Sequence, residues 1–268
     1  VTEGIALSDN ILMAKLGLRL GPARLHDWVA SFHFGHKLGV CLPGEGAGIM
    51  GAPMARHVLR AGFEVFVHSR TRSKTDALVA DGATWAATPA VLAQHSDAVI
   101  TVVSDTPDVE QIYLGSDGIC TSLRPGTLCI DMSTVSPDIA RTVAAETAHR
   151  GCAFLDAPVS GGKTGAEAGT LAIMVGGDAK DLERAMPLFR AMGKTVVHCG
   201  PVGSGQLTKM CNQILCGLNL LAVSEALTFA SRVGLDPNTV LQVVSAGAAG
   251  SWALSNLGPK MIARDFKP

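Results

Sequence analysis

The chain has 268 residues, of which 47% are hydrophobic and 17% are charged. This composition is typical of a folded protein with one large or two modest domains, and it excludes a disordered chain. The formal net charge of -1 gives no electrostatic reason to expect nucleic acid or an anionic membrane as a partner.

We interpret residues 1–36 as an N-terminal extension. Lys15, Arg19 and Arg24 would suit a transit-type leader, but the segment is neither rich in serine nor free of acidic residues. We therefore expect a cytoplasmic location, or an organellar one if the extension is a transit segment.

From residue 38 to residue 200, short apolar runs alternate with helical patterns, and this alternation is typical of βαβ units in a parallel sheet. Strands are predicted at 38–42, 64–68, 98–103, 127–131, 153–156, 171–175 and 195–198. Helices are predicted at 52–61, 74–80, 89–94, 109–114, 137–150 and 181–191. The sequence thus predicts the α/β class, with a Rossmann-like dinucleotide-binding domain over residues 37–199.

The pattern becomes entirely helical after Gly200, with a long helix at 203–233 and a second at 238–246. We expect an all-α domain over residues 200–268. The apolar stretch 214–223 is shorter than the roughly 18 residues that a membrane span needs, so it predicts a buried helix. Because the long helix is apolar around much of its circumference, we expect it to pack against a second subunit in a homodimer or homotetramer.

A glycine-rich turn follows the first predicted strand and leads into an apolar helix: Gly46-Ala47-Gly48-Ile49-Met50-Gly51. In a GxGxxG motif the first glycine permits the tight turn, the second lets the backbone approach a pyrophosphate, and the third lets the helix pack on the strand. The motif alone is weak, but this context favours a dinucleotide site at a helix N-terminus. Pro43 is unusual where a central strand is expected.

The loop after the second predicted strand, residues 68–73, indicates which dinucleotide binds. An acidic residue there would favour NAD, yet none occurs before Asp76. Arg70 and Arg72 could clamp a 2′-phosphate, with Thr71 as a hydrogen-bonding partner. We therefore expect NADP, with NAD as the alternative, while a basic loop without a ligand would look the same.

The start of the long helix places Gly205, Lys209, Asn212 and Gln213 on one face. A lysine on an apolar helix is costly to bury unless it has a partner or a role. Partial burial would ease proton transfer near neutral pH, whereas a snorkelling surface lysine is the alternative.

Residues 156–162 are rich in small residues, and they could cradle a carboxylate or form an ordinary turn. The histidines and cysteines show no metal-ligand spacing, so no metal site is expected.

Four ordered blocks resemble the 3-hydroxyisobutyrate dehydrogenase-related, or β-hydroxyacid dehydrogenase, family. They are GAGIMGAPMA at 46–55, DMSTVSP at 131–137, FLDAPVSGGKTGAEAGTLAIMVGG at 154–177 and GSGQLTKMCNQ at 203–213. The likeness covers residues 38–268. Within the family, the stretch 212–237 looks most like the tartronate semialdehyde (2-hydroxy-3-oxopropionate) reductases.

The resemblance implies a role for each matching residue. Lys209 would be the catalytic general acid/base that protonates the forming alkoxide as the nicotinamide delivers hydride. The implied substrate-binding residues are Ser133, Ser160, Gly161, Gly162 and Asn212. The implied cofactor-binding residues are Gly46, Ala47, Gly48, Ile49, Met50, Gly51, Arg70, Thr71, Val103, Ser104 and Thr134.

The expected function is NADP-dependent interconversion of a small semialdehyde acid and its β-hydroxy acid, such as tartronate semialdehyde and glycerate. Alternatives are a 3-hydroxyisobutyrate or 4-hydroxybutyrate dehydrogenase and a non-catalytic dinucleotide-binding protein. An imine reductase is disfavoured, because such enzymes usually lack this lysine. Three departures from the family plan stand out: the extension 1–36, Pro43-Gly44-Glu45 before the glycine turn, and an end at Pro268 where members continue through further helices. The helical domain is therefore expected to be incomplete.

Overall fold

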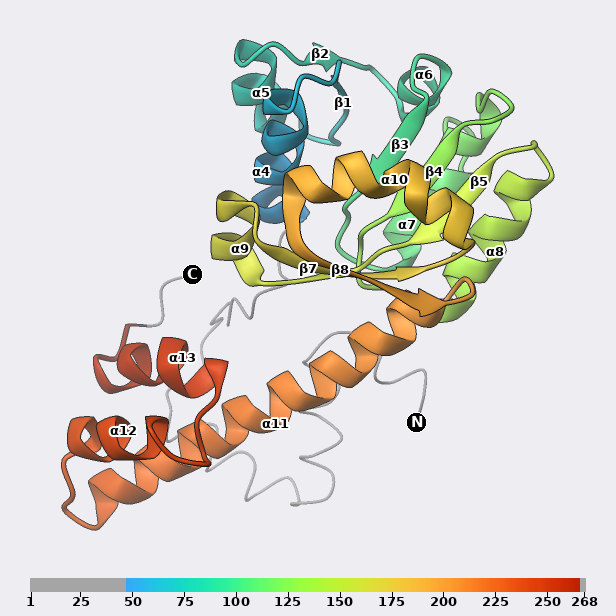
Figure 1. Ribbon diagram of the computed structural model, residues 1–268. Helices are drawn as coiled ribbons and strands as arrows, with labels where there is room; N and C mark the ends of the chain where they lie inside the picture. The colour runs from blue at the N-terminus through green and yellow to red at the C-terminus, as the bar shows by residue number, and fades with distance from the viewer. Residues whose placement is uncertain (1–46, 266–268) are drawn as a thin grey trace. The chain divides into compact units, whose positions relative to one another are not determined.

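The computed structural model describes residues 47–265 of the chain (Figure 1). The extension 1–36, the strand predicted at 38–42 and Gly46 lie outside these residues. The described chain forms two compact units, one ending at Lys209 and one beginning at Met210. The division falls inside one long helix.

The main sheet of the first unit combines parallel and antiparallel strands. Strands β3 (Ala98–Thr101), β4 (Leu128–Asp131) and β5 (Ala153–Asp156) are parallel neighbours. Strand β7 (Leu171–Gly176) is antiparallel to β5 and to the short β6 (Val159–Ser160), and β8 (Gly193–Gly200) pairs in parallel with β7. A separate pair of parallel strands is formed by β1 (Phe66–Val67) and β2 (Thr84–Trp85).

The antiparallel pairing of β7 corrects the expectation of a parallel sheet. Only residues 161–170 separate β6 from β7, and they include helix α9 (Gly162–Ala168). A crossover between parallel strands needs about a dozen residues or more, so this shorter connection returns the chain in the opposite direction. Strand β6 and helix α9 were not predicted, because they are too short to show a period.

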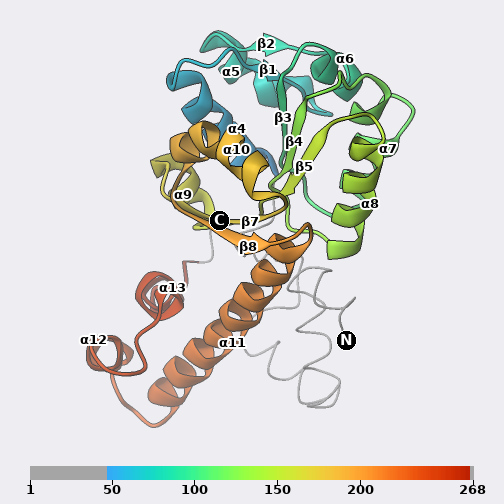
Figure 2. The same ribbon diagram turned by 45° about the vertical axis from the view of Figure 1, so that its right-hand side comes forward.

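Helices cover both faces of the main sheet (Figures 1 and 2). Leu128 and Ile130 of β4 pack on one side with helices α4, α9 and α10, whereas Cys129 packs on the other side with α6, α7 and α8. This alternation is the pleat of a strand buried on both faces. The helices not yet bounded are α4 (Ala47–Arg60), α5 (Asp76–Ala80), α6 (Pro89–Gln94), α7 (Thr106–Leu114), α8 (Pro137–Ala148) and α10 (Ala179–Met192), with 3₁₀ turns at η1 (Arg72–Thr75) and η2 (Ile119–Thr121).

The second unit consists of helices. Helix α11 (Ser204–Arg232) begins in the first unit, and α12 (Pro237–Ser245) and α13 (Trp252–Ile262) follow it. Val223 and Leu227 of α11 form a small core with Ala253 and Leu254 of α13. Helix α13 was not predicted, because Gly258 and Pro259 lie within it and interrupt its helical pattern.

The middle of α11 differs from the buried helix that the sequence predicts at 214–223. Leu215 and Leu218 are 63% and 49% exposed, whereas Val223 is buried. The expectation is wrong for most of this stretch, since the described core of the second unit reaches only the later part of α11. By length and composition, α11 is the one described helix that could cross a membrane, which is weak evidence on its own.

Candidate active site

The parallel strands β3, β4 and β5 end together at Thr101, Asp131 and Asp156, which are direct neighbours in the strand register. In α/β sheets ligands bind outside the carboxyl ends of the parallel strands. Both aspartates are completely buried, so their polar groups need partners inside the protein.

Asp131 is the centre of a buried hydrogen-bond network. Its Oδ1 accepts hydrogen bonds from Thr101 Oγ1 and Ser133 Oγ, both at 2.7 Å, and from Ser133 N at 3.2 Å. Thr101 Oγ1 also lies 3.3 Å from Tyr113 Oη. Among the described side chains, Asp131 Oδ2 has no hydrogen-bond partner. Burial, with a smaller contribution from the negative charge of Asp156, raises the pKa of Asp131 from 3.8 to about 6.

The raised pKa predicts that Asp131 destabilises the fold as the pH increases. Well below pH 4 the carboxyl is protonated in both states. As the pH rises from about 3 to about 7, the folded state holds more protons than the unfolded state, so the free energy of unfolding falls by about 3 kcal/mol in total. Asp131→Asn cannot titrate, and urea unfolding from about pH 3 to about pH 7 should show the wild type losing this stability relative to the variant. Parallel pH curves would contradict the prediction.

Ser133 joins the turn after β4 to the loop after β3. Its hydroxyl donates to Asp131 and accepts from Val103 N at 2.9 Å, so both of its hydrogen-bonding roles are used internally. Val103 is half-buried, while Ser104 and Thr134 beside these positions are exposed. The structure therefore brings Val103 and Ser133 together directly, with the side chains of Ser104 and Thr134 accessible from solvent.

Asp156 holds the start of α11. Its Oδ1 accepts from Gly203 N at 2.7 Å and its Oδ2 accepts from Gln206 N at 2.9 Å. A carboxylate in this position satisfies backbone N–H groups that the first helical turn leaves free, and it complements the helix dipole. Burial raises the pKa of Asp156, and the N–H groups that bind the carboxylate oppose that rise.

Lys209 follows on the same helix and is only 7% exposed. The alternative of a snorkelling surface lysine is therefore wrong. Gln206, one turn earlier and 1% exposed, donates from Nε2 to Ser133 O at 2.8 Å and accepts from Val135 N at Oε1, at 3.0 Å. The lysine thus lies one turn from a residue that contacts the ends of the parallel strands.

Three residues of this arrangement were not predicted as functional: Asp131, Asp156 and Gln206. All three stand inside sequence blocks that carry the family resemblance. A signal was present in the two aspartates, because each is the last residue of an otherwise apolar strand.

Asn212 and Gln213 come next on α11, in the second unit. Asn212 Nδ2 donates to Gln213 Oε1 at 2.9 Å and lies 3.5 Å from Cys216 Sγ. Asn212 is therefore three residues from Lys209 on one continuous helix, as the spacing predicted.

The predicted carboxylate cradle lies on a separate turn, from β6 into α9. Ser160 ends β6, and the next two residues have the positive φ angles of 137° at Gly161 and 60° at Gly162. Backbone conformations of this kind favour glycine, so the identity of these residues follows from the local geometry.

The glycine-rich motif forms the start of α4 in the described residues. Ala47, Gly48, Ile49 and Met50 are in its first turns. A Cβ added at Gly51 would lie 3.5 Å from Val102 Cβ, an ordinary contact distance. A small side chain at position 51 would therefore fit against Val102, so the packing there does not strictly require glycine.

The basic loop that follows β1 is exposed. Arg70, whose side chain is 82% exposed, pairs with Asp108 of α7 at 3.0 Å. The Arg72 guanidinium lies 5.7 Å from the centroid of the Trp85 ring, which is within the range of a cation–π contact. Thr71 N donates to Ser69 Oγ at 3.4 Å. The two arginines that the sequence singled out thus have different neighbours, and Arg70 faces a competing carboxylate.

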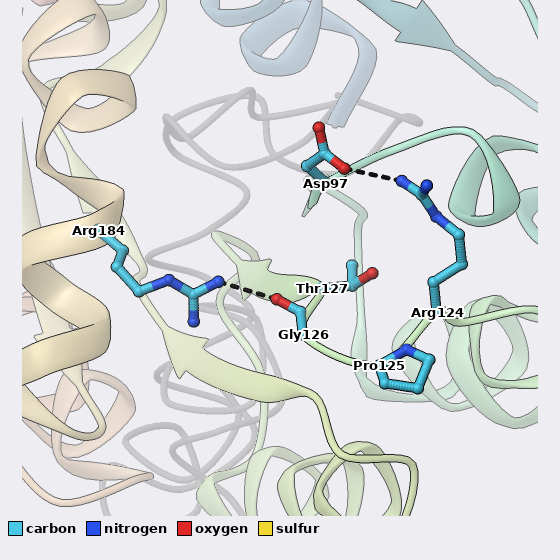
Figure 3. Close-up of a pocket in the computed structure, with 6 residues that line it drawn as sticks. All are labelled: Asp97, Arg124, Pro125, Gly126, Thr127 and Arg184. Atoms are coloured by element: carbon cyan, nitrogen blue, oxygen red, sulfur yellow. Dashed lines mark hydrogen bonds and ion pairs between the residues drawn. The ribbon is translucent and has the colours of Figure 1, made fainter.

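A pocket lies at the other end of the strands (Figure 3), lined by Asp97, Arg124, Pro125, Gly126, Thr127 and Arg184. Arg124 pairs with Asp97 at 2.7 Å, and Arg184 Nη2 donates to Gly126 O at 2.8 Å. Apart from Arg184, which lies on α10, these residues precede β3 and β4, so the pocket is at the amino ends of the strands and does not belong to the arrangement around Asp131 and Lys209.

Comparisons with known proteins assign the family. Residues 45–200 match the NAD binding domain of 6-phosphogluconate dehydrogenase, and residues 203–268 match the NAD-binding domain of NADP-dependent 3-hydroxyisobutyrate dehydrogenase. The chain is 43% identical to 2-hydroxy-3-oxopropionate reductase of Escherichia coli, over 83% of this chain and 76% of the relative. It is 42% identical to the NAD-dependent L-serine dehydrogenase of Pseudomonas aeruginosa, over 80% of this chain and 72% of the relative.

A solved structure agrees with these sequence matches. The 3-hydroxyisobutyrate dehydrogenase of Mycobacterium tuberculosis, with L-serine, superposes with a TM-score of 0.74 at 34% identity, covering 83% of this chain and 78% of that one. The fold is therefore that of the α/β Rossmann-like dehydrogenases with a helical C-terminal part, as the sequence predicted. The chain belongs to the 3-hydroxyisobutyrate dehydrogenase-related family of NAD(P)-dependent β-hydroxyacid dehydrogenases.

Proposed function

We propose that the chain interconverts a small semialdehyde acid and its β-hydroxy acid with NADP, and that tartronate semialdehyde and glycerate are its preferred pair. The observation that carries this proposal is the burial of Lys209 on a helix held against the ends of β4 and β5. The identity to 2-hydroxy-3-oxopropionate reductase supports the choice of substrate.

Lys209 acts as the general acid in reduction and as the general base in oxidation. Its Nζ gives a proton to the carbonyl oxygen of the semialdehyde, and in the reverse direction it accepts the proton of the hydroxyl group. The dinucleotide, when bound, would supply the hydride to the carbonyl carbon in reduction and accept it from the hydroxyl-bearing carbon in oxidation. Asn212 orients the reacting oxygen toward Lys209, and Ser160, Gly161 and Gly162 bind the substrate carboxylate through the serine hydroxyl and backbone N–H groups.

The residues present fit a dinucleotide. The first turn of α4 carries the glycine-rich motif and offers helix N–H groups to a pyrophosphate. Val103, Ser104 and Thr134 stand at the ends of β3 and β4, where the nicotinamide is expected. Ser133, whose hydroxyl is bound to Asp131 and to Val103 N, borders both the substrate and the nicotinamide at this edge.

Arg70 selects NADP by binding the 2′-phosphate. Its exposed ion pair with Asp108 is worth less than about 1 kcal/mol, so a phosphate displaces the carboxylate. Arg70→Ala is expected to raise the KM for NADPH about tenfold, because one charge-assisted hydrogen bond is lost, and to leave the KM for NADH unchanged. Steady-state kinetics with both cofactors measure this difference.

Two further variants sharpen the cofactor test. Arg190→Ala removes an exposed arginine on α10 and should change neither KM. Asp108→Asn frees the Arg70 guanidinium and should lower the KM for NADPH. An equal effect of Arg70→Ala on both cofactors would argue against a 2′-phosphate site and for NAD.

L-Serine oxidation is a second candidate, because one matched relative is named an L-serine dehydrogenase and one matched solved structure is that of a 3-hydroxyisobutyrate dehydrogenase with L-serine. L-Serine is itself a β-hydroxy acid, so the same lysine and carboxylate contacts would suit it. The test compares kcat/KM for the oxidation of glycerate with kcat/KM for the oxidation of L-serine, 3-hydroxyisobutyrate and 4-hydroxybutyrate, each with NADP and with NAD, and it includes the reduction of tartronate semialdehyde with NADPH. A higher kcat/KM for any of the other three hydroxy acids than for glycerate would replace the preferred pair, and no turnover of any compound would refute the proposal.

The exposed apolar residues of α11 support the expectation of a homodimer or homotetramer. Leu215 and Leu218 are large, apolar and accessible in the described residues, and such surfaces commonly mark interfaces. Light scattering of the protein should report more than one subunit per particle. A purely monomeric particle would contradict the expectation. The cytoplasmic location and the division into a Rossmann domain at 37–199 and a helical domain at 200–268 stay predictions.

A further inference from the structure

Gln206 is a buried side chain that uses its whole amide group to bind one short turn. The amide nitrogen donates to Ser133 O at 2.8 Å, and the amide oxygen accepts from Val135 N at 3.0 Å. A primary amide is costly to bury unless both ends are satisfied. Here the side chain binds the backbone on both sides of Thr134, as a neighbouring strand would.

The backbone of Gln206 is anchored separately. Its N–H donates to Asp156 Oδ2 at 2.9 Å, which holds this turn of α11 to the end of β5. A Cβ at the preceding residue, Gly205, would lie 2.4 Å from Met174 O and 2.6 Å from Asp156 O, so the helix backbone lies directly against the strands. Gln206 is therefore fixed to β5 through its backbone and to the turn after β4 through its side chain.

Lys209 is three residues further on the same helix, and residues at this spacing share one face. The turn that Gln206 binds carries Ser133 and Thr134, the residues expected beside the nicotinamide. Ser133 is in turn held by Asp131. Gln206 thus connects Lys209, which is expected to transfer the proton, with Ser133 and Thr134, which are expected to lie beside the nicotinamide.

We propose that Gln206 is a positioning residue that sets the distance between Lys209 and the nicotinamide side of the site. The inference rests on the proposed function, and it adds a residue that the proposed chemistry does not itself require. A displacement of about 1 Å between reacting groups can cost on the order of a hundredfold in rate. Loss of the two side-chain hydrogen bonds releases the turn at 133–135 without removing any group that touches the substrate.

Two substitutions of similar shape test the proposal. Gln206→Met fills the same space and makes neither hydrogen bond, whereas Gln206→Glu keeps an acceptor for Val135 N and loses the donor to Ser133 O. Both are expected to lower kcat at least tenfold while the KM for the cofactor changes less than threefold. A primary isotope effect measured with deuterated NADPH should rise, because the hydride step becomes slower.

The matched control is Thr147→Val on α8. Thr147 is completely buried, and its Oγ1 donates to Ala144 O at 3.0 Å, so the variant also loses a hydrogen bond in the first unit. It is expected to lower the thermal midpoint and to leave kcat within twofold of the wild type. If Gln206→Met lowers the midpoint and leaves kcat unchanged in the same way, Gln206 is structural only and the proposal is overturned.

Hydrogen exchange of the protein without cofactor gives a readout that is independent of turnover. The Val135 amide should exchange at least tenfold faster in Gln206→Met and at the wild-type rate in Thr147→Val. Unchanged exchange at Val135 would refute the proposal. If the wild type turns over none of the tested acids, the proposed function fails, and the positioning role fails with it even where the exchange result shows that Gln206 holds the turn.

Discussion

Lys209→Ala is expected to lower kcat for the reduction of tartronate semialdehyde by roughly a hundredfold or more, which is the usual contribution of a positioned general acid. The lysine is buried on the helix that Asp156 holds against the strand ends, so no solvent-exposed group takes its place. The KM for NADPH should change little, because the residues expected to bind the dinucleotide lie on other elements. Single-turnover kinetics with a separate measurement of NADPH binding check both statements.

The control for this experiment is Lys194→Ala, which removes an exposed lysine from β8. It should leave kcat unchanged. Lys209→Met separates chemistry from packing, since methionine retains the apolar stem of the side chain. Rates similar to the wild type in both Lys209 variants would remove the lysine from the mechanism, and a loss of NADPH binding would assign it to the cofactor instead.

The second large effect is expected for Gly205→Ala. The new Cβ would lie 2.4 Å from Met174 O and 2.6 Å from Asp156 O, and backbone oxygens cannot move aside as the end of a flexible side chain can. We expect the free energy of unfolding to fall by about 3 kcal/mol, the upper part of the usual range for overpacking. Urea unfolding followed by circular dichroism measures the change.

Gly247→Ala is the matched control, because it adds the same methyl group where the nearest atom, Val244 O, is 3.9 Å away. Its effect should stay below about 1 kcal/mol. Equal stabilities of the two variants would mean that α11 can shift away from β5 and β7 at no cost. In that case kcat of Gly205→Ala would report whether the shift displaces Lys209.

Much of the fold could be predicted from local sequence signals. Helix α6 and strand β5 have the predicted bounds. Helix α8 begins at the predicted residue, because Ser136 Oγ accepts from Asp138 N and proline occupies the first helical position. The apolar helix at the glycine-rich motif and the helix that carries Lys209 were also predicted this way. These features depend on residues within one or two helical turns of each other, so a short stretch of sequence is enough to predict them.

The sequence by itself therefore determined the α/β class, most helices and strands, the family and the lysine to test first. Only the tertiary structure decided that β7 runs antiparallel to β5, that Leu215 is exposed, and that Lys209 is buried. It alone revealed the hydrogen bonds from Gln206 to positions 71 and 73 residues away. Contacts across such separations depend on how strands and helices pack together, and no local pattern of residue types specifies which distant backbone group a buried amide will meet.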